Sequence, residues 1–222
     1  MYMDTEPGGG VPERAAFAER LATLKREGSS ILVVGAADTQ PTACRRLTGG
    51  ETSTPRRQLF VLTTAGVGHA TVPDTADAAD DIRVVRRNDG DGGRSPGIET
   101  VVDADALPPL GTEIVDTMRA MEAAAGGFEP SELRLCVDSL DPLFDAHGDE
   151  AVFRFLHVVT AAATDLTAMG HYHLDRGPDS DAARLLEPLF DATIEVRRVE
   201  GVDEHRWYLH DEDVTTDWVP VD

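Results

Sequence analysis

The octapeptide LRLCVDSL, residues 133–140, is the feature from which a fold can first be predicted. Apolar side chains dominate its first five positions, and the run ends at Asp138 and Ser139. A short apolar run that stops at a carboxylate is typical of a buried central strand in a parallel sheet. Asp138 would then lie at the carboxyl edge of the sheet, where open α/β sheets bind their ligands. The alternative is a buried strand whose terminal Asp only caps the next turn.

Predicted strands and helices alternate along the rest of the chain. The predicted strands are residues 31–34, 58–63, 82–85, 98–102 and 167–174, and the predicted helices are residues 13–27, 41–48, 112–125, 149–165 and 179–186. Residues 189–199 and 206–210 have the pattern of a terminal pair of strands. This alternation predicts a three-layer α/β fold with a mainly parallel central sheet and an antiparallel C-terminal strand pair.

The length of 222 residues suits one such domain and is short for two. We expect a flexible leader at residues 1–12, a single domain at residues 13–212 and a polar tail at residues 213–222. Within the tail, Trp218 is expected to fold back onto the domain.

The composition is strongly acidic. The chain has 41 Asp and Glu residues against 20 Lys and Arg residues, a formal charge of −21, and Lys25 is its only lysine. Such an excess resembles that of proteins from extreme halophiles, whose acidic surfaces stay hydrated in molar salt. Because this charge repels phosphate backbones, no nucleic-acid partner is expected.

Cysteine usage and hydropathy suggest a compartment. Cys44 and Cys136 lie in predicted core segments without the spacing of a paired motif, so we expect reduced, buried thiols. The first thirty residues lack the apolar run of a signal peptide, and no run approaches the ~18 residues of a membrane span. A cytoplasmic protein without a membrane partner is expected.

The loop after the first predicted strand, GAADTQPT, occupies the place of a P-loop, G-x-x-x-x-G-K-[ST]. It keeps the first Gly as Gly35 and the final Thr as Thr42, but has Gln40 for the second Gly and Pro41 for the Lys. The missing Lys would neutralise the β- and γ-phosphates, and the missing Gly would let backbone N–H groups cradle them. Asp38 adds a negative charge beside the place for a triphosphate.

The order of these segments resembles the RecA superfamily on its KaiC/RadA side, and more closely an uncharacterised family of haloarchaeal KaiC-like proteins. The likeness covers about residues 25–210 and is most specific at residues 133–140 and 166–196. It implies a RecA-like P-loop fold, with Asp138 at the magnesium-binding position and Thr42 at the P-loop Ser/Thr position. The vestigial nucleotide site that it implies comprises Gly35, Thr42, Asp138 and Ser139.

Two departures from the KaiC-like pattern concern catalysis. KaiC-like ATPases carry a catalytic Glu just after the second strand, where this chain has Thr63-Thr64-Ala65. They also use a Lys/Arg element near the C-terminus. In this chain, Arg206 begins the strand at that place, and no lysine follows it. Without a phosphate clamp or a general base, the site lacks the groups that stabilise the phosphates and activate the attacking water. The resemblance therefore implies a pseudo-ATPase that is not an enzyme and needs no cofactor.

Two classes of function follow. The first is a non-catalytic regulatory or signalling module that binds a protein partner and is compatible with a homo-oligomer. The alternative is a nucleotide-binding protein or NTPase that uses ATP and magnesium through an atypical P-loop, which Thr42, Asp138 and Ser139 would serve.

His171 and His173 form a separate metal-site candidate. Because they alternate on one predicted strand, both side chains lie on the same side, and Asp175 follows. Two imidazoles with a nearby carboxylate suit zinc. The alternative is purely structural: one ring packed and one solvated, or both hydrogen-bonded at the sheet edge.

The net charge generates a prediction about salt. Lowering the ionic strength lengthens the screening distance, so the acidic side chains repel one another more strongly. We expect the protein to loosen or unfold below roughly 0.5 M salt. Circular dichroism across a salt series checks this, and a spectrum unchanged down to ~0.05 M salt would contradict the halophile interpretation.

Overall fold

The computed structural model describes residues 11–49, 56–64, 69–70, 72, 82–88, 98–103, 106–212 and 214–221. Residues 1–10 of the predicted leader lie outside this part of the chain. The helix α1 begins at Val11, so residues 11 and 12 are helical rather than part of a flexible leader.

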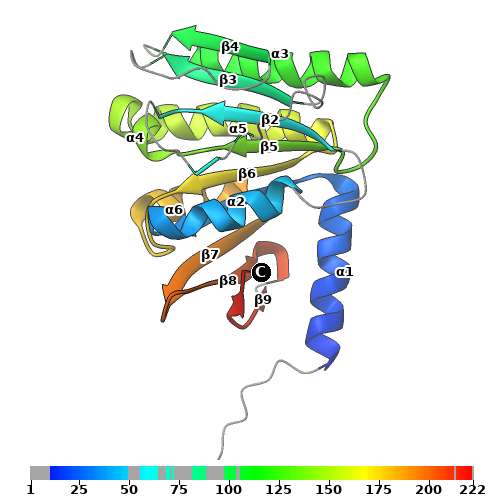
Figure 1. Cartoon of the computed structure of the whole chain (residues 1–222), viewed down its shortest axis with the longest axis vertical. Coiled ribbons are helices and arrows are strands. Elements are labelled where there is room, and N and C mark those ends of the chain that lie inside the picture. Colours follow the sequence, from blue (N-terminus) through cyan, green and yellow to red (C-terminus); the bar gives the residue numbers. More distant parts are fainter. Residues whose placement is uncertain are drawn as a thin grey trace, which may run out of the picture.

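One ten-stranded sheet runs through the molecule (Figure 1). Its strands are β1 (Ser29–Gly35), β2 (Arg57–Leu62), β3 (Ile82–Asn88), β4 (Ile98–Asp103), β5 (Leu133–Val137), β6 (Met169–Leu174), β7 (Ala192–Val199), β8 (Val202–Leu209), β9 (Val214–Thr215) and β10 (Val219–Pro220). The order across the sheet is β10-β8-β7-β1-β6-β5-β2-β3-β4, with β9 paired to β8. Strands β1 to β7 pair in parallel, whereas β8 pairs antiparallel with β7, β9 and β10. The predicted fold class is therefore confirmed.

Helices cover both faces of this sheet. They are α1 (Val11–Glu27), α2 (Gln40–Thr48), α3 (Leu107–Ala125), α4 (Asp141–His147), α5 (Asp149–Asp165) and α6 (Asp181–Leu186), with 3-10 turns at Ala37–Thr39, Glu187–Leu189 and His210–Glu212. Helices α3 to α6 bury one face through the main apolar cluster, to which Ile114 of α3 and Leu156 of α5 belong. Helix α2 packs on the opposite face, and α1 places Leu24 against β7 and β8 (Figure 1).

Coverage on both faces explains why the central strands are buried along their whole length. Every residue of β5 and of β6 is buried, including the polar Arg134, His171 and His173. In β7, farther from the centre, the buried positions alternate with partly exposed ones in the first half of the strand. Strands buried on both faces are typical of a parallel sheet between two helical layers.

The strand order separates the loop after β1 from Asp138 after β5. Strand β6 lies between β1 and β5 and pairs with both. Its register sets His173 beside Val33 of β1, and His171 beside Cys136 of β5. Since side chains alternate along a strand, His171, His173 and Cys136 all face the layer that contains α2.

The predicted polar tail is in fact part of the sheet. Of residues 213–222, two short segments form β9 and β10 on β8. Trp218 packs beneath two guanidinium groups, 3.8 Å from that of Arg197 and 4.7 Å from that of Arg206 to the ring centre. Two-residue strands leave no periodicity in the sequence, so this pairing was missed.

Within the described ranges, none of the helices combines the length and the apolar character needed to cross a membrane.

Gly35 generates a prediction about the β1–α2 connection. Its φ is +143°, and a Cβ there would lie 2.3 Å from the carbonyl oxygen of Val196 on β7. We expect Gly35→Ala to lower the free energy of unfolding by more than the ~1–2 kcal/mol of a left-handed penalty alone, because β7 must also move. Gly126→Ala is the control, since its φ is +78° and no atom lies within 4 Å of its Cβ position. Equal losses in denaturant titrations would contradict the steric argument.

Candidate functional site

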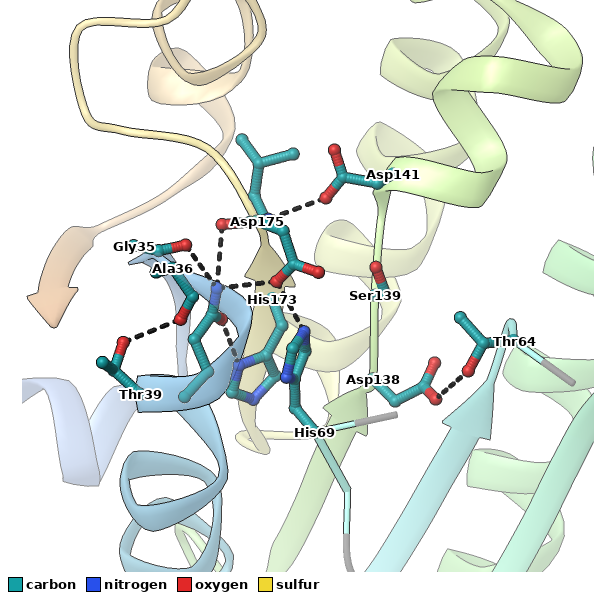
Figure 2. A network of polar contacts seen from close by, with 12 residues as sticks. Gly35, Ala36, Thr39, Thr64, His69, Asp138, Ser139, Asp141, His173 and Asp175 are labelled. Carbon is teal, nitrogen blue, oxygen red and sulfur yellow. Dashed lines mark hydrogen bonds and ion pairs between the residues drawn. The ribbon is translucent and has the colours of Figure 1, made fainter. Parts of the chain in front are cut away.

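The candidate site lies at the carboxyl edge of the sheet, where β1, β6, β5 and β2 end side by side (Figure 2). These ends carry Gly35 of β1, Asp175 after β6, Asp138 after β5 and Thr63 after β2. Ligands bind at this edge in open α/β sheets. The topology thus places Gly35 and Asp138 at the same edge of the sheet, with β6 between their two strands.

The carboxamide of Gln40 lies at the centre of the β1 side of the site. Its Nε2 is 3.0 Å from the carbonyl oxygen of Gly35, 3.0 Å from that of Leu174 and 2.9 Å from Oδ1 of Asp175. Because these oxygens accept hydrogen bonds, Nε2 is the donor, and Oε1 is left as an acceptor. His173 Nδ1 lies 2.8 Å from this Oε1. Because Oε1 can only accept, Nδ1 carries the proton and donates it.

His69 also belongs to this hydrogen-bond network, through its contact with Asp175. Nε2 of His69 lies 2.6 Å from Oδ1 of Asp175, and its ring centre lies 5.2 Å from that of His173. Burial alone would lower the pKa of His69, but the hydrogen bond and negative charge of Asp175 outweigh it and raise that pKa. The carboxylate of Asp175 is thus held by both Gln40 and His69.

The loop between β1 and α2 is a 3-10 turn. Both the backbone N–H and the hydroxyl of Thr39 donate to the carbonyl oxygen of Ala36, at 3.0 and 2.7 Å (Figure 2). Asp38 of this turn pairs with Arg198 at 2.9 Å. A P-loop instead directs its N–H groups toward phosphate oxygens.

Asp138 is buried, with 2% of its surface exposed, and is held by hydrogen bonds from β2. Its Oδ1 accepts from the N–H and the hydroxyl of Thr63, each at 2.8 Å, and its Oδ2 accepts from the hydroxyl of Thr64 at 3.2 Å. Burial raises the pKa of Asp138, although the hydrogen bonds from Thr63 and Thr64 oppose the rise. The hydroxyl of Thr63 also contacts the carbonyl oxygen of buried Ser139 at 2.5 Å.

Thr42 is not part of this arrangement. Among the described residues, the donors to the Asp138 carboxylate are Thr63 and Thr64, and Thr42 is not one of them. The hydroxyl of Thr42 donates instead to Oδ2 of Asp203 on β8, at 3.1 Å. Because α2 begins at Gln40, Thr42 lies within its first turn and faces β8.

His171 and His173 face a pair of cysteines rather than Asp175. Cys44 on α2 and Cys136 on β5 are free and buried, as predicted, and their sulfur atoms are 3.4 Å apart. The Sγ of Cys44 lies 3.5 Å from Nε2 of His171. The hydrogen bonds from Cys136 and, to a smaller extent, His171 lower the pKa of Cys44, whereas burial raises that of Cys136.

Sequence reasoning missed the roles of several residues for different reasons. The substitution of Gln40 for a motif glycine was visible, but its partners on β6 were not. His69 follows β2 without a motif, and the two cysteines are 92 positions apart, so no local spacing links them.

Residues 28–196 match a family of unknown function, DUF7504. The chain belongs to this family. No curated protein matches this DUF7504 chain. Among solved structures, it is similar to a KaiC-like protein of the hyperthermophilic archaeon Pyrococcus horikoshii OT3, with 14% identity, a TM-score of 0.55, and coverage of 87% of this chain and 85% of that one. At this identity the similarity shows the fold alone, and it supports the predicted KaiC/RecA-like architecture.

Asp138 can be tested by two substitutions. In Asp138→Asn, the amide oxygen can still accept from Thr63, and the amide nitrogen can donate to the Thr64 hydroxyl. We therefore expect a loss of about 1–2 kcal/mol or less in the free energy of unfolding. Asp138→Ala leaves the buried N–H of Thr63 without its acceptor and should cost more, about 1–3 kcal/mol for each orphaned group.

Denaturant unfolding in high salt measures both losses, and Asp179→Asn on the exposed β6–α6 loop is the control for removing one negative charge. If Asp138→Asn were as costly as Asp138→Ala, the proposed hydrogen-bonding role of the carboxylate would be wrong.

Proposed function

We propose that this DUF7504 chain is a non-catalytic RecA/KaiC-like domain, a pseudo-ATPase that works in regulation or signalling by binding a protein partner. The observation that carries the proposal is the position of the Gln40 side chain. It takes the place of the second P-loop glycine and is hydrogen-bonded to Gly35, Leu174, Asp175 and His173.

Opening this place for phosphates would break the Gln40 network. The carboxamide is fully buried, and so is the ring of His173. A buried donor or acceptor that loses its partner costs about 1–3 kcal/mol. A triphosphate would have to replace these bonds without the lysine that a P-loop provides, since Pro41 stands at that position.

The charges at this edge also disfavour a triphosphate. Two cations lie nearby, but Arg176 pairs with Asp141 at 2.7 Å and Arg198 pairs with Asp203 at 2.6 Å. The only lysine, Lys25, accepts a hydrogen bond through its carbonyl from Ser131, just before β5 at the opposite edge of the sheet. Within the described residues, these two arginines stand against the carboxylates of Asp38, Asp138, Asp141, Asp175 and Asp203, so negative charge is in excess at this edge. The net field repels phosphates.

At the position where KaiC-like ATPases carry a catalytic glutamate, this chain has threonine hydroxyls instead of a carboxylate. Thr63 and Thr64 follow β2, and both donate to Asp138. A neutral threonine hydroxyl is far too weak a base to take a proton from water at neutral pH. Hydrolysis would lack the group that orients and activates the attacking water.

The remaining parts of the proposal follow from the charge of −21. A field of this sign disfavours nucleic acid and anionic membrane surfaces as partners. It leaves a protein partner, or a homo-oligomer once salt screens the repulsion between like-charged copies. We also propose a cytoplasmic location in a halophilic archaeon, where molar salt screens the self-repulsion.

The alternative is an NTP-binding protein with an atypical P-loop. The position of Asp138 favours it, because the carboxylate ends the strand at which RecA-like ATPases hold magnesium. Asp141 and Asp175 lie at the same edge and could complete an oxygen-rich environment for that ion.

Melting temperatures with and without millimolar Mg-ATP in high salt distinguish the two. For the proposed pseudo-ATPase, we expect no shift for the wild type or for Asp138→Asn, and no phosphate release. A ligand at 100 times its dissociation constant would stabilise the fold by about 2.7 kcal/mol. A magnesium-dependent shift in the wild type that Asp138→Asn loses would instead establish the atypical NTP site.

A further inference from the structure

We propose that Cys44, Cys136, His171 and His173 together bind one zinc ion inside the domain. This proposal does not depend on whether the chain binds a nucleotide. The four ligand atoms all lie within 4.8 Å of one another, and they come from α2, β5 and β6.

The strand order creates this cluster. Insertion of β6 between β1 and β5 puts the two histidines next to β5, and the parallel register pairs His171 with Cys136. Helix α2 follows β1 and crosses the same face, where Cys44 packs in an apolar cluster with Cys136 and Phe60. Four ligands thus converge without any spacing motif in the sequence.

The distances suit tetrahedral coordination. Zinc bonds of about 2.3 Å to sulfur and 2.0–2.1 Å to nitrogen at tetrahedral angles place two sulfurs about 3.8 Å apart and a sulfur and a nitrogen about 3.5 Å apart. The two sulfurs are 3.4 Å apart, and Cys44 Sγ is 3.5 Å from Nε2 of His171. These two separations need only a few tenths of an ångström of adjustment, whereas the widest separation among the four atoms, up to 4.8 Å, would have to close by about 1 Å.

His173 provides a second and independent indication. Its Nδ1–H donates to Gln40, so its Nε2 carries a lone pair. This Nε2 is buried and finds no hydrogen-bond partner among the residues that the structure describes. Buried polar atoms rarely stay unsatisfied in folded proteins, and a metal ion would use this lone pair. Donation of the other ring proton to an amide oxygen is the usual outer contact of a zinc-binding histidine.

The chemistry of the ligand set points to zinc in a structural role. Two thiolates and two imidazoles favour zinc over the hard cations magnesium and calcium. Binding releases one proton from each thiol and gives a neutral centre, which burial tolerates. None of the four residues is more than 2% exposed, so the site has no open position for a substrate.

A bound ion would also stabilise the Gln40 network. It would hold the His173 ring through Nε2 while Nδ1 continues to donate to Gln40. Cys44 would at the same time tie α2 to the sheet one turn after Gln40. Zinc and the closed β1–α2 loop would thus stabilise each other.

The first test uses the wild-type protein. It is produced without a His-tag, purified in molar KCl without chelators, and its metals are measured by inductively coupled plasma mass spectrometry. We expect about one zinc ion per chain. After removal of zinc, cobalt(II) should produce the visible absorption of a tetrahedral site together with a thiolate-to-metal charge-transfer band, and zinc should abolish both.

Variants then locate the ion. Cys44→Ser and His173→Gln should lose the zinc and the cobalt spectrum. His157→Gln, on the exposed side of α5, is the matched control and should retain both. If the site variants fail to fold, the cobalt spectrum of the wild type still tests the ligand set.

Three results would overturn the proposal. One is wild-type protein without zinc that shows no thiolate charge-transfer band with cobalt. Another is a Cys44–Cys136 disulfide in protein isolated without added oxidant. The last is zinc that survives Cys44→Ser but is lost in His69→Asn, which would place the ion beside Asp175. None of these results bears on the Mg-ATP experiment, so the two proposals can fail separately.

Discussion

The hydrogen bond between His173 Nδ1 and Gln40 Oε1, 2.8 Å long, joins the two parts of the molecule on which the site depends. His173 lies on β6 in the middle of the sheet, and Gln40 is the first residue of α2. This bond orients the Gln40 carboxamide so that its nitrogen bonds the carbonyls of Gly35 and Leu174. It also fixes the tautomer of the imidazole, because the proton on Nδ1 leaves Nε2 with a lone pair.

The Gln40 network and the Cys2His2 cluster are two results of one topology. Because β6 separates β1 from β5, its side chains facing α2 lie between the β1–α2 loop and the strand that ends in Asp138. In an ATP-binding RecA-like domain this region supports phosphates and magnesium. Here it is occupied by amide, imidazole and thiol groups that bond to one another. The acidic groups that remain, such as Asp138 and Asp175, are held by Thr63 and His69.

Much of the fold could be predicted from local pattern. Apart from Arg134, β5 is apolar because both faces of the strand are covered, and its carboxyl end shows which edge Asp138 must occupy. The departures from the P-loop motif at Gln40 and Pro41 were likewise visible in the sequence, because a motif is a statement about neighbours along the chain. The partners of Gln40 were not, since they lie about 135 positions away on β6 and after it.

The sequence by itself determined the alternation of strands and helices, the acidic surface charge and the absence of the lysine and glutamate that ATP hydrolysis needs. Only the tertiary structure decided that Thr42 turns to Asp203 and that the thiols of Cys44 and Cys136 meet beside His171. The physical reason is that periodicity records which face of a strand is buried, whereas contacts between strands depend on their order and register. A one-residue slip of β6 against β5 would send His171 and His173 to the opposite face, yet it would leave the sequence pattern unchanged.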